Sequence, residues 1–499
     1  MTLADRARAL GRVETVWLAL PVFAAVLRVF LTPIEPADSW YHLAIGRTIV
    51  AEGAIPRTDR FSFTRAGESH FEQSWLADVV LYTTHRTLGN EGLVVLAALV
   101  VAASQVLLLG VLLARGADAR AAALLGILWV ALAGNNWNVR PQTFTIPLFL
   151  GLLAVLDRHR RDGKGPLWFI PVLLALWANL HGSFPIGATL IGIACFAEGT
   201  RRLLRRAGTL DPSAWRRLVL WSALGILALA ANPRGFEVFR YVAGVSGHHV
   251  VRARMEEWTP AGVAEPAGAL FLCYAVLWAA LHAGARRTPT LEDALRFFVF
   301  LPLALSMRRA ILWFSIASLP ALGTLATFML AGRSRSSRFR PAARERPAAN
   351  AVLLSLLVLL TAAASPWTKP RLGLDPAVGS LVSPETPVAA TEALARDRGR
   401  PERVFHSMEA GSWIVWAAPE VKVFVDPRIE LYPEELWEDY LALSRGERVE
   451  ELLAKYEVNG LLLSRAGEAA LLAAVLASGE WDIRHEDGAA VYLVRWAGR

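Results

Sequence analysis

Apolar runs of roughly 15–23 residues recur along most of the chain and alternate with short segments rich in arginine. At a rise of about 1.5 Å per residue, a helix of this length matches the hydrocarbon core of a bilayer. The pattern predicts about eleven spanning helices and therefore a multi-pass α-helical membrane protein. We expect them near residues 14–32, 91–114, 121–135, 143–156, 166–180, 183–199, 218–232, 265–282, 292–306, 310–331 and 350–366.

The composition agrees with this interpretation. Hydrophobic residues make up 54% of the 499 residues and charged residues only 19%, and the 18 tryptophans suit membrane interfaces. The two cysteines, Cys195 and Cys273, lie inside apolar runs, which argues against a disulfide framework and a cysteine-ligated metal. The first apolar run has no small-residue cleavage site, so we expect a retained span.

Charge is divided unevenly along the chain. Residues 367–499 contain 15 Lys/Arg and 22 Asp/Glu, a net charge of −7. Because the whole chain has a net charge of +8, residues 1–366 carry a net charge of +15. Those arginines lie between spans, where they orient the protein in the membrane, and the basic balance does not indicate nucleic acid. Alternate loops collect them, which predicts a cytoplasmic N-terminus and, after an odd number of spans, an extracytoplasmic C-terminal region.

The opposite set of loops mixes acids, histidine, arginine and tryptophan. It comprises 33–90, 135–142, the corner at His181, 233–264 and the corner at 307–309. Ionisable groups at membrane depth are costly and usually face a cavity or a pathway. Their convergence on one face of the bilayer is the main functional signal in the sequence.

The first external loop carries the acid that we consider for catalysis. Pro36 ends the first span, and Asp38 or Ser39 is placed to cap a helix over 39–52 that we expect to lie along the membrane interface. Asp38 is therefore either a helix cap or a catalytic base above the membrane. His42, four residues later, is either a substrate ligand or a structural residue. We expect Glu35, Asp59 and Glu72 to be solvated or structural.

The other external corners supply candidates for binding an anion. Arg140 offers a planar fork suited to phosphate, although snorkelling towards lipid headgroups is an equal alternative. Arg308 and Arg309 lie on the predicted external side, whereas most of the other arginines lie on the cytoplasmic side. This exception indicates an anionic ligand. His181 is either functional or a satisfied structural histidine, and Arg234 follows a turn that closes a span.

Metal binding is not expected. His248 and His249 are adjacent, so on a helix they point apart, and no carboxylate follows at ligand spacing. We therefore predict neither a metal site nor another cofactor.

The C-terminal region has the pattern of a small α/β domain. We predict a transmembrane domain over 1–366, a linker over 367–400 and a soluble domain over 401–499. Expected strands lie at 403–406, 421–425, 460–464, 481–485 and 489–494, with helices at 433–444, 447–456 and 466–478. The segment Asp426–Arg428 follows an expected strand and is placed either to line a binding surface or to serve the structure alone.

Several motifs carry a resemblance that covers nearly the whole chain. They are Asp38–Arg47, Ile55–Asp59, Arg140–Gln142, Leu180–Gly182, Asn232-Pro233 with Gly235, and Val423–Arg428. With these motifs, the chain resembles poorly described bacterial membrane proteins and, in architecture, the GT-C superfamily of polytopic glycosyltransferases. The protein mannosyltransferases and aminoarabinose transferases form the nearest well-known branch.

This resemblance implies an activity and a location. Asp38 matches the family's acid after the first span, which deprotonates an acceptor that attacks the anomeric carbon with inversion, while external arginines stabilise the leaving polyprenyl phosphate. Asp38 is followed by Ser39 and not by a second acid, with Glu35 one turn earlier, which leaves the second acid of the family unassigned. The implied partners are a polyprenyl-phosphate sugar, a lipid, glycan or protein acceptor, and the lipids of a bacterial inner membrane.

Two other classes of function stay open at this point. A transporter or flippase for a lipid-linked anion would need polar residues at the bilayer midplane, and the centres of the expected spans are nearly free of charge. A non-catalytic membrane scaffold would tolerate the loss of Asp38.

Overall fold

The computed structural model describes residues 12–247, 256–285, 289–332, 346–374 and 380–496. The chain forms two compact units, each assembled from separate segments. Unit 1 comprises residues 1–32, 94–238 and 254–379, and unit 2 comprises 33–93, 239–253 and 380–499. The first external loop and the C-terminal region thus belong to the same unit.

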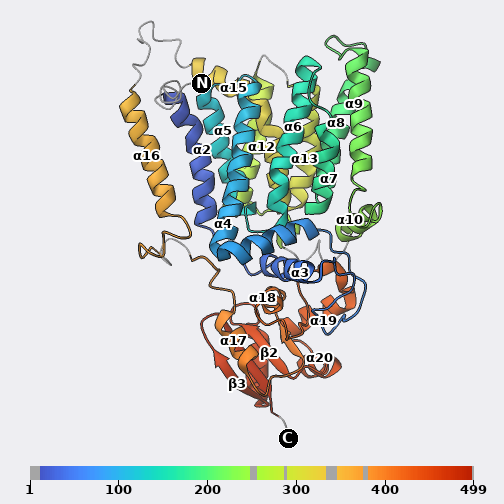
Figure 1. Cartoon of the computed structure of the whole chain (residues 1–499), viewed down its shortest axis with the longest axis vertical. Helices are drawn as coiled ribbons and strands as arrows, with labels where there is room; N and C mark the ends of the chain where they lie inside the picture. The colour runs from blue at the N-terminus through green and yellow to red at the C-terminus, as the bar shows by residue number, and fades with distance from the viewer. Residues whose placement is uncertain (1–11, 248–255, 286–288, 333–345, 375–379, 497–499) are drawn as a thin grey trace. The chain divides into compact units, whose positions relative to one another are not determined.

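Unit 1 is a helical bundle whose long helices run side by side (Figure 1). Its helices are α2 (Val13–Phe30), the second part of α4 (Trp75–Ala114), α5 (Ala119–Ala133), α6 (Thr145–Asp162), α7 (Phe169–Leu180), α8 (Phe184–Leu203), α9 (Pro212–Ala228), α12 (Pro266–Gly284), α13 (Leu291–Ser306), α14 (Ile311–Ser318), α15 (Gly323–Gly332) and α16 (Pro347–Ala363). Short 3-10 turns, η1 (Gly134–Asn136), η2 (Pro141–Phe144), η3 (Glu256–Trp258), η4 (Arg308–Ala310) and η5 (Leu319–Leu322), lie between them.

Local sequence signals set several helix ends. Asp118, Asp211 and Thr290 each accept a backbone N–H at the start of α5, α9 and α13, which satisfies a donor that the first helical turn leaves unpaired. Gly163 ends α6 with a positive φ of 66°, a conformation that costs glycine little.

Each of the eleven expected spans contains a helix of unit 1 or the second part of α4. Within the described residues, four helical segments are long and apolar enough to cross a membrane: Val13–Phe30, Trp75–Ala114, Pro266–Gly284 and Arg308–Leu330. The number of spans therefore stays a prediction. At Gly89 the backbone of α4 leaves the helical region, which separates the first part of α4 from the expected span over 91–114.

Unit 2 contains a four-stranded sheet with the order β1-β2-β4-β3. The strands are β1 (Val404–His406), β2 (Gly460–Ser464), β3 (Trp481–Glu486) and β4 (Ala490–Arg495), and only β1 and β2 are parallel. The unit also holds α3 (Ser39–Glu52), the first part of α4, most of α10 (Glu237–Gly247), α17 (Val388–Arg396), α18 (Met408–Ala417), η6 (Ile429–Leu431), α19 (Glu434–Ser444), α20 (Val449–Lys455) and α21 (Ala469–Ser478). The expected small α/β domain is present.

The expected strand at 421–425 is wrong. Val423 forms only an isolated bridge with Ser62, and its N–H and C=O bond to the backbone of Phe61 and Phe63 at 2.9 and 3.0 Å. The apolar run is buried because residues 61–63 of the first loop pair with it. The local pattern of apolar and polar residues does not reveal this distant partner.

Helix α3 forms where it was expected, but its apolar residues are covered by protein. Trp40 is fully buried and meets Trp413 of α18 edge-to-face, with ring centroids 4.6 Å apart. The Tyr41 N–H donates to the Ser412 hydroxyl at 3.1 Å. The apolar residues of α3 that suggested a helix at the membrane interface are thus residues that pack on α18.

A buried ion cluster also joins the first loop to the C-terminal region within unit 2. The Arg428 guanidinium donates to Asp59 at 2.6 Å and to both oxygens of Asp426, and all three side chains are almost fully buried. Phe61 lies under the guanidinium, 5.1 Å from its ring centroid. Asp426 and Arg428 therefore have a structural role, which explains this part of the C-terminal motif without a ligand.

Candidate functional site

Asp38 occupies the N-cap position of α3, yet its side chain makes no capping hydrogen bond. The capping alternative therefore loses its support. The Asp38 carbonyl accepts the N–H of His42 at 3.2 Å, so the two residues lie one turn apart on the same helix.

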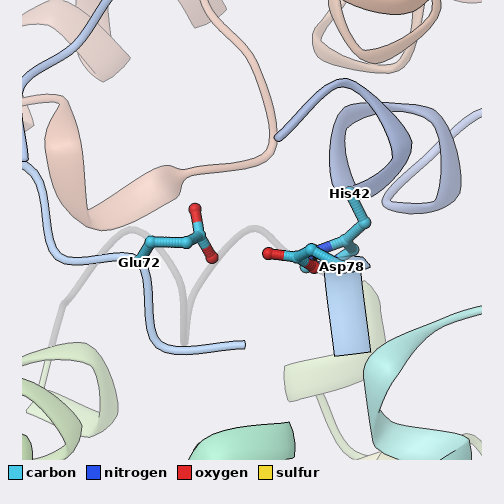
Figure 2. Close-up of side chains that lie close together, drawn as sticks. All are labelled: His42, Glu72 and Asp78. Atoms are coloured by element: carbon cyan, nitrogen blue, oxygen red, sulfur yellow. Dashed lines mark hydrogen bonds and ion pairs between the residues drawn. The ribbon is translucent and has the colours of Figure 1, made fainter. Parts of the chain in front are cut away.

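His42, Glu72 and Asp78 gather in unit 2 (Figure 2). The Nδ1–H of His42 donates to Asp78 Oδ1 at 2.7 Å, and the carboxylate of Glu72 faces this pair. All three side chains are buried, and His70 donates to Glu72 at 3.3 Å. We call His42, Glu72 and Asp78 the first-loop acid cluster.

The packing of α3 against α4 fixes the contact between His42 and Asp78. Gly46 lies where the helices approach most closely, because an added Cβ would stand 2.1 Å from the Asp78 carbonyl oxygen and 2.7 Å from Tyr82 Cβ. A larger residue at this position would push the helices apart, so glycine is required here by close approach.

The cluster changes the acidity of its members. Burial lowers the pKa of His42, but the adjacent Asp78 carboxylate raises it more, and the net pKa lies above its ordinary value of 6.5. Burial raises the pKa of Glu72, but the hydrogen bond from His70 and nearby His42 outweigh it, so the net pKa is lowered. Burial and then the Glu72 carboxylate raise the pKa of Asp78 well above its ordinary value, so Glu72 is the acid of this site that is held ionised.

A second loop contributes to the same unit through α10. Tyr241 donates to Glu430 at 2.6 Å and stacks on Phe71 with ring centroids 4.6 Å apart. Burial raises the pKa of Tyr241 well above its ordinary range, with the Glu430 carboxylate adding to the shift. Tyr241 therefore remains a neutral hydrogen-bond donor.

The first-loop acid cluster has the ligand types of a cation site, since its donor atoms lie within 4.8 Å of one another. Its His42 nitrogen is already bonded to Asp78, however, and this hydrogen bond accounts for their contact without an ion. The absence of a metal remains our prediction. His248 and His249 lie outside the described residues.

In unit 1, arginines predicted to be external meet at one corner. Arg140 pairs with Glu257, and Arg309 donates to Gln142 Oε1 at 2.7 Å while its guanidinium lies 4.9 Å from the Trp258 ring centroid. Burial raises the pKa of Glu257, but Arg140 and then Arg309 lower it more, so the net pKa is depressed. Two of the candidate arginines thus share one carboxylate.

Arg308 belongs to the same corner. Its N–H donates to the Thr259 carbonyl at 2.8 Å, and its guanidinium donates to Glu265 at 2.8 Å. Three arginines therefore face two acids, Glu257 and Glu265, across η3 and η4, which leaves a formal charge of 3 − 2 = +1. We call Arg140, Arg308 and Arg309 the arginine corner.

His181 and Arg234 are held by local contacts. His181 Nδ1 accepts the Ser183 N–H at 3.1 Å, at the end of α7, and Arg234 pairs with Glu237 at 3.5 Å in the turn after α9. Asn179 connects the two turns by donating to the Ala231 carbonyl at 2.8 Å. Local hydrogen bonding explains both residues, and a role in binding substrate stays a prediction.

Several residues of these clusters were not anticipated as site residues. Asp78 is an acid in the first turn of an otherwise apolar helix, and Glu257 precedes a tryptophan in the second long loop. What marks Asp78 as a site residue is that this acid is buried. Its burial depends on the packing of α3 against α4, which the local sequence does not reveal.

No protein-family model matches this chain, and no curated protein matches its sequence. Solved structures do match it. The oligosaccharyltransferase AglB from Archaeoglobus fulgidus, solved with an inhibitory peptide and a dolichol-phosphate, is similar over 93% of this chain and 72% of its own, with 13% identity and a TM-score of 0.55. ArnT from Cupriavidus metallidurans in the apo state is similar over 96% and 97%, with 16% identity and a TM-score of 0.53.

The chain has the GT-C fold.

The GT-C likeness extends to a third protein. The arabinofuranosyltransferase AftD from mycobacteria is similar over 97% of this chain, which spans 40% of AftD, with 15% identity and a TM-score of 0.52. ArnT has also been solved with undecaprenyl phosphate, again with a matching fold at 15% identity and a TM-score of 0.50. At such identities the comparison establishes the fold and leaves the substrate open.

Proposed function

We propose that this GT-C protein transfers a sugar from a polyprenyl-phosphate donor to an acceptor on the extracytoplasmic face of a bacterial inner membrane. The observation that carries the proposal is the arginine corner, where Arg140 and Arg309 converge on Glu257. Guanidinium groups suit phosphate because they offer planar, paired donors. The similar AglB and ArnT structures contain dolichol-phosphate and undecaprenyl phosphate, which is the same ligand chemistry.

The proposed reaction is a single displacement with inversion. Asp38 removes the proton of an acceptor O–H, and the acceptor oxygen forms a bond to the anomeric carbon as the bond from that carbon to the phosphate oxygen breaks. The polyprenyl phosphate leaves with the bonding electrons, and Asp38 then returns its proton to water. The arginine corner binds the donor phosphate, equally before and after the bond to the sugar breaks.

The first-loop acid cluster supports the site in a different way. Asp78 holds the His42 ring one turn after Asp38, so we assign His42 to acceptor or sugar binding and Asp78 to positioning. We further assign His181 and Arg234 to the edge of the donor site.

The test compares the full-length protein, its Asp38→Asn variant and a Glu68→Gln control for transfer of radiolabelled sugar from a panel of polyprenyl-phosphate sugars. Glu68 is an exposed acid of the same loop. Loss of transfer by about 100-fold or more in Asp38→Asn alone supports the proposal. Equal transfer by all three removes Asp38 as the base, and an acceptor product that retains the donor's anomeric configuration contradicts the single displacement.

A parallel set of reactions contains a metal chelator. We expect transfer to continue unchanged, because His42 Nδ1 and Asp78 Oδ1 already bond to each other. Loss of transfer that an added divalent cation restores would instead assign a cation to these residues. If no donor is used while polyprenyl phosphate still binds, the transporter or scaffold alternatives replace the enzyme.

A further inference from the structure

Unit 1 contains a cavity of about 420 Å³ at the ends of its helices that lie away from the arginine corner. Arg160 lines it near the end of α6, about 22 Å along that helix from Thr145 at a rise of 1.5 Å per residue. Glu292 lines it at the start of α13, and Glu198 lines it near the end of α8. This cavity has no part in the proposed transfer reaction.

Paired charges form one side of the cavity. Arg115 donates to Asp157 at 2.6 Å and to Asp293 at 2.7 Å, and Arg296 donates to Asp157 at 2.8 Å. Arg160 pairs with Glu292 at 3.2 Å. Charges buried this deeply cost free energy even when paired, and ionisable residues in membrane helices commonly mark a ligand site.

The charge balance of this network favours an anion. Its lining has four arginines (Arg115, Arg160, Arg161 and Arg296) and four acids (Asp157, Glu198, Glu292 and Asp293). Arg201 and Arg202 pair with two of these acids, so the network has 6 − 4 = +2 formal charges. A phosphate monoester carries about −1.5 to −2 at neutral pH, which would balance this excess.

Two buried polar atoms of the wall lack a partner among the described residues. They are Nε of Arg296, whose side chain is 2% exposed, and Nδ1 of His159. The other nitrogen of His159 donates to the Ala214 carbonyl at 3.1 Å, so Nδ1 of the neutral ring is an acceptor. Unpartnered buried polar groups are rare in proteins, and an anion in the cavity would accept a hydrogen bond from Arg296 Nε.

Most of the remaining wall is apolar, with Leu156, Leu218 and Pro320 among its residues. A small inorganic ion would leave this part of the cavity unused, whereas the headgroup and first chain atoms of a lipid would fill both parts. We propose that this cavity binds a phosphate monoester, presented by a lipid headgroup, at the face of the bundle opposite the arginine corner.

Binding to the purified full-length protein tests the proposal. Isothermal titration calorimetry is run with short-chain phosphatidic acid, with phosphatidylcholine of the same chain length and with inorganic phosphate, for the parent, Arg160→Gln and Arg158→Gln. Arg160 lines the cavity and its loss leaves Glu292 paired with Arg201, while Arg158 is an exposed arginine of the same helix that pairs with Asp162. Thermal unfolding of each variant confirms that it is folded.

We expect the parent to bind phosphatidic acid at least tenfold more tightly than phosphatidylcholine, Arg160→Gln to lose that preference and Arg158→Gln to retain it. Inorganic phosphate that binds as tightly as phosphatidic acid would show that the phosphate site is correct but that lipid is not its source. Absence of saturable binding by the parent, or an equal loss in both variants, overturns the proposal.

An apolar substitution distinguishes the two sources independently of charge. Ala194 lines the cavity, and Ala194→Leu would reduce the space beside the apolar wall. We expect this variant to weaken phosphatidic acid at least fivefold and to leave phosphate unchanged. Unchanged binding of phosphatidic acid would contradict a lipid ligand. These measurements do not depend on transfer activity, so they stand apart from the test of the proposed function.

Discussion

The first-loop acid cluster of unit 2 and the arginine corner of unit 1 are built from opposite charges. The cluster sets Glu72 and Asp78 around one histidine, whereas the corner sets three arginines around Glu257 and Glu265. Each has a countercharge of its own, so neither needs the other to be stable. The function that we propose accordingly assigns proton chemistry and phosphate binding to separate parts of the chain.

The buried ion cluster of unit 2 should give the largest effect on stability. Arg428→Ala leaves Asp59 and Asp426 buried without their shared cation, and we expect a loss of about 3–5 kcal/mol. Thermal unfolding followed by tryptophan fluorescence measures it, with Arg445→Ala, an exposed arginine, as the control. Equal melting temperatures for the two variants would show that the cluster does not hold this unit together.

The arginine corner should respond in donor binding and little in turnover. Arg309→Gln removes the bond to Gln142 and the contact with Trp258, and we expect the KM for the donor to rise about 10- to 100-fold. Steady-state kinetics with the donor varied measures this, beside exposed Arg216→Gln. A fall in kcat at constant KM would contradict a role in binding the ground-state phosphate.

The acid cluster should respond to geometry. Gly46→Ala forces α3 away from α4 and lengthens the His42–Asp78 contact, so we expect kcat to fall about tenfold. Gly110→Ala is the matched control, because nothing lies within 4 Å of the added Cβ. If both variants retain full turnover, the position of His42 has no bearing on the reaction.

The smallest effect concerns pH. Because the folded pKa of His42 is raised, its protonated ring among Asp78, Asp38 and Glu72 contributes stability that is complete below the unfolded pKa and is lost as pH rises through the folded pKa. Above pH 6.5 we therefore expect the parent to lose about 1 kcal/mol more than His42→Asn does. Melting temperatures of both proteins from pH 6 to 9 measure the difference, and parallel curves would exclude a stabilising protonated His42.

The sequence predicts those parts of the fold that local hydrophobicity determines. A long apolar run forms a helix wherever it is packed, so all eleven expected intervals contain helix. The run at Val421–Val425 is wrong as a strand because its partner, the first loop, lies about 360 residues earlier in the chain. Similarly, the sequence pattern of α3 does not distinguish a helix at a membrane interface from a helix that packs on α18, because both need an apolar face.

The candidate site follows the same rule. Arg140 and Arg309 are predictable as a pair because both lie in loops on one side of the expected spans, and the structure brings them to Glu257. Asp78 is not predictable, because its importance arises from the contact with His42 across two helices. Long-range pairing of this kind leaves no periodic signal in the sequence.

The central claim is the division of work between Asp38 and the arginine corner, and one kinetic comparison tests it. Transfer by the parent, Asp38→Asn and Arg309→Gln is measured with the donor concentration varied, after each protein is shown to be folded. The account predicts that Asp38→Asn lowers kcat by about 100-fold or more at an unchanged donor KM, while Arg309→Gln raises the donor KM at a nearly unchanged kcat. The reverse pattern, or identical effects from both substitutions, would contradict it.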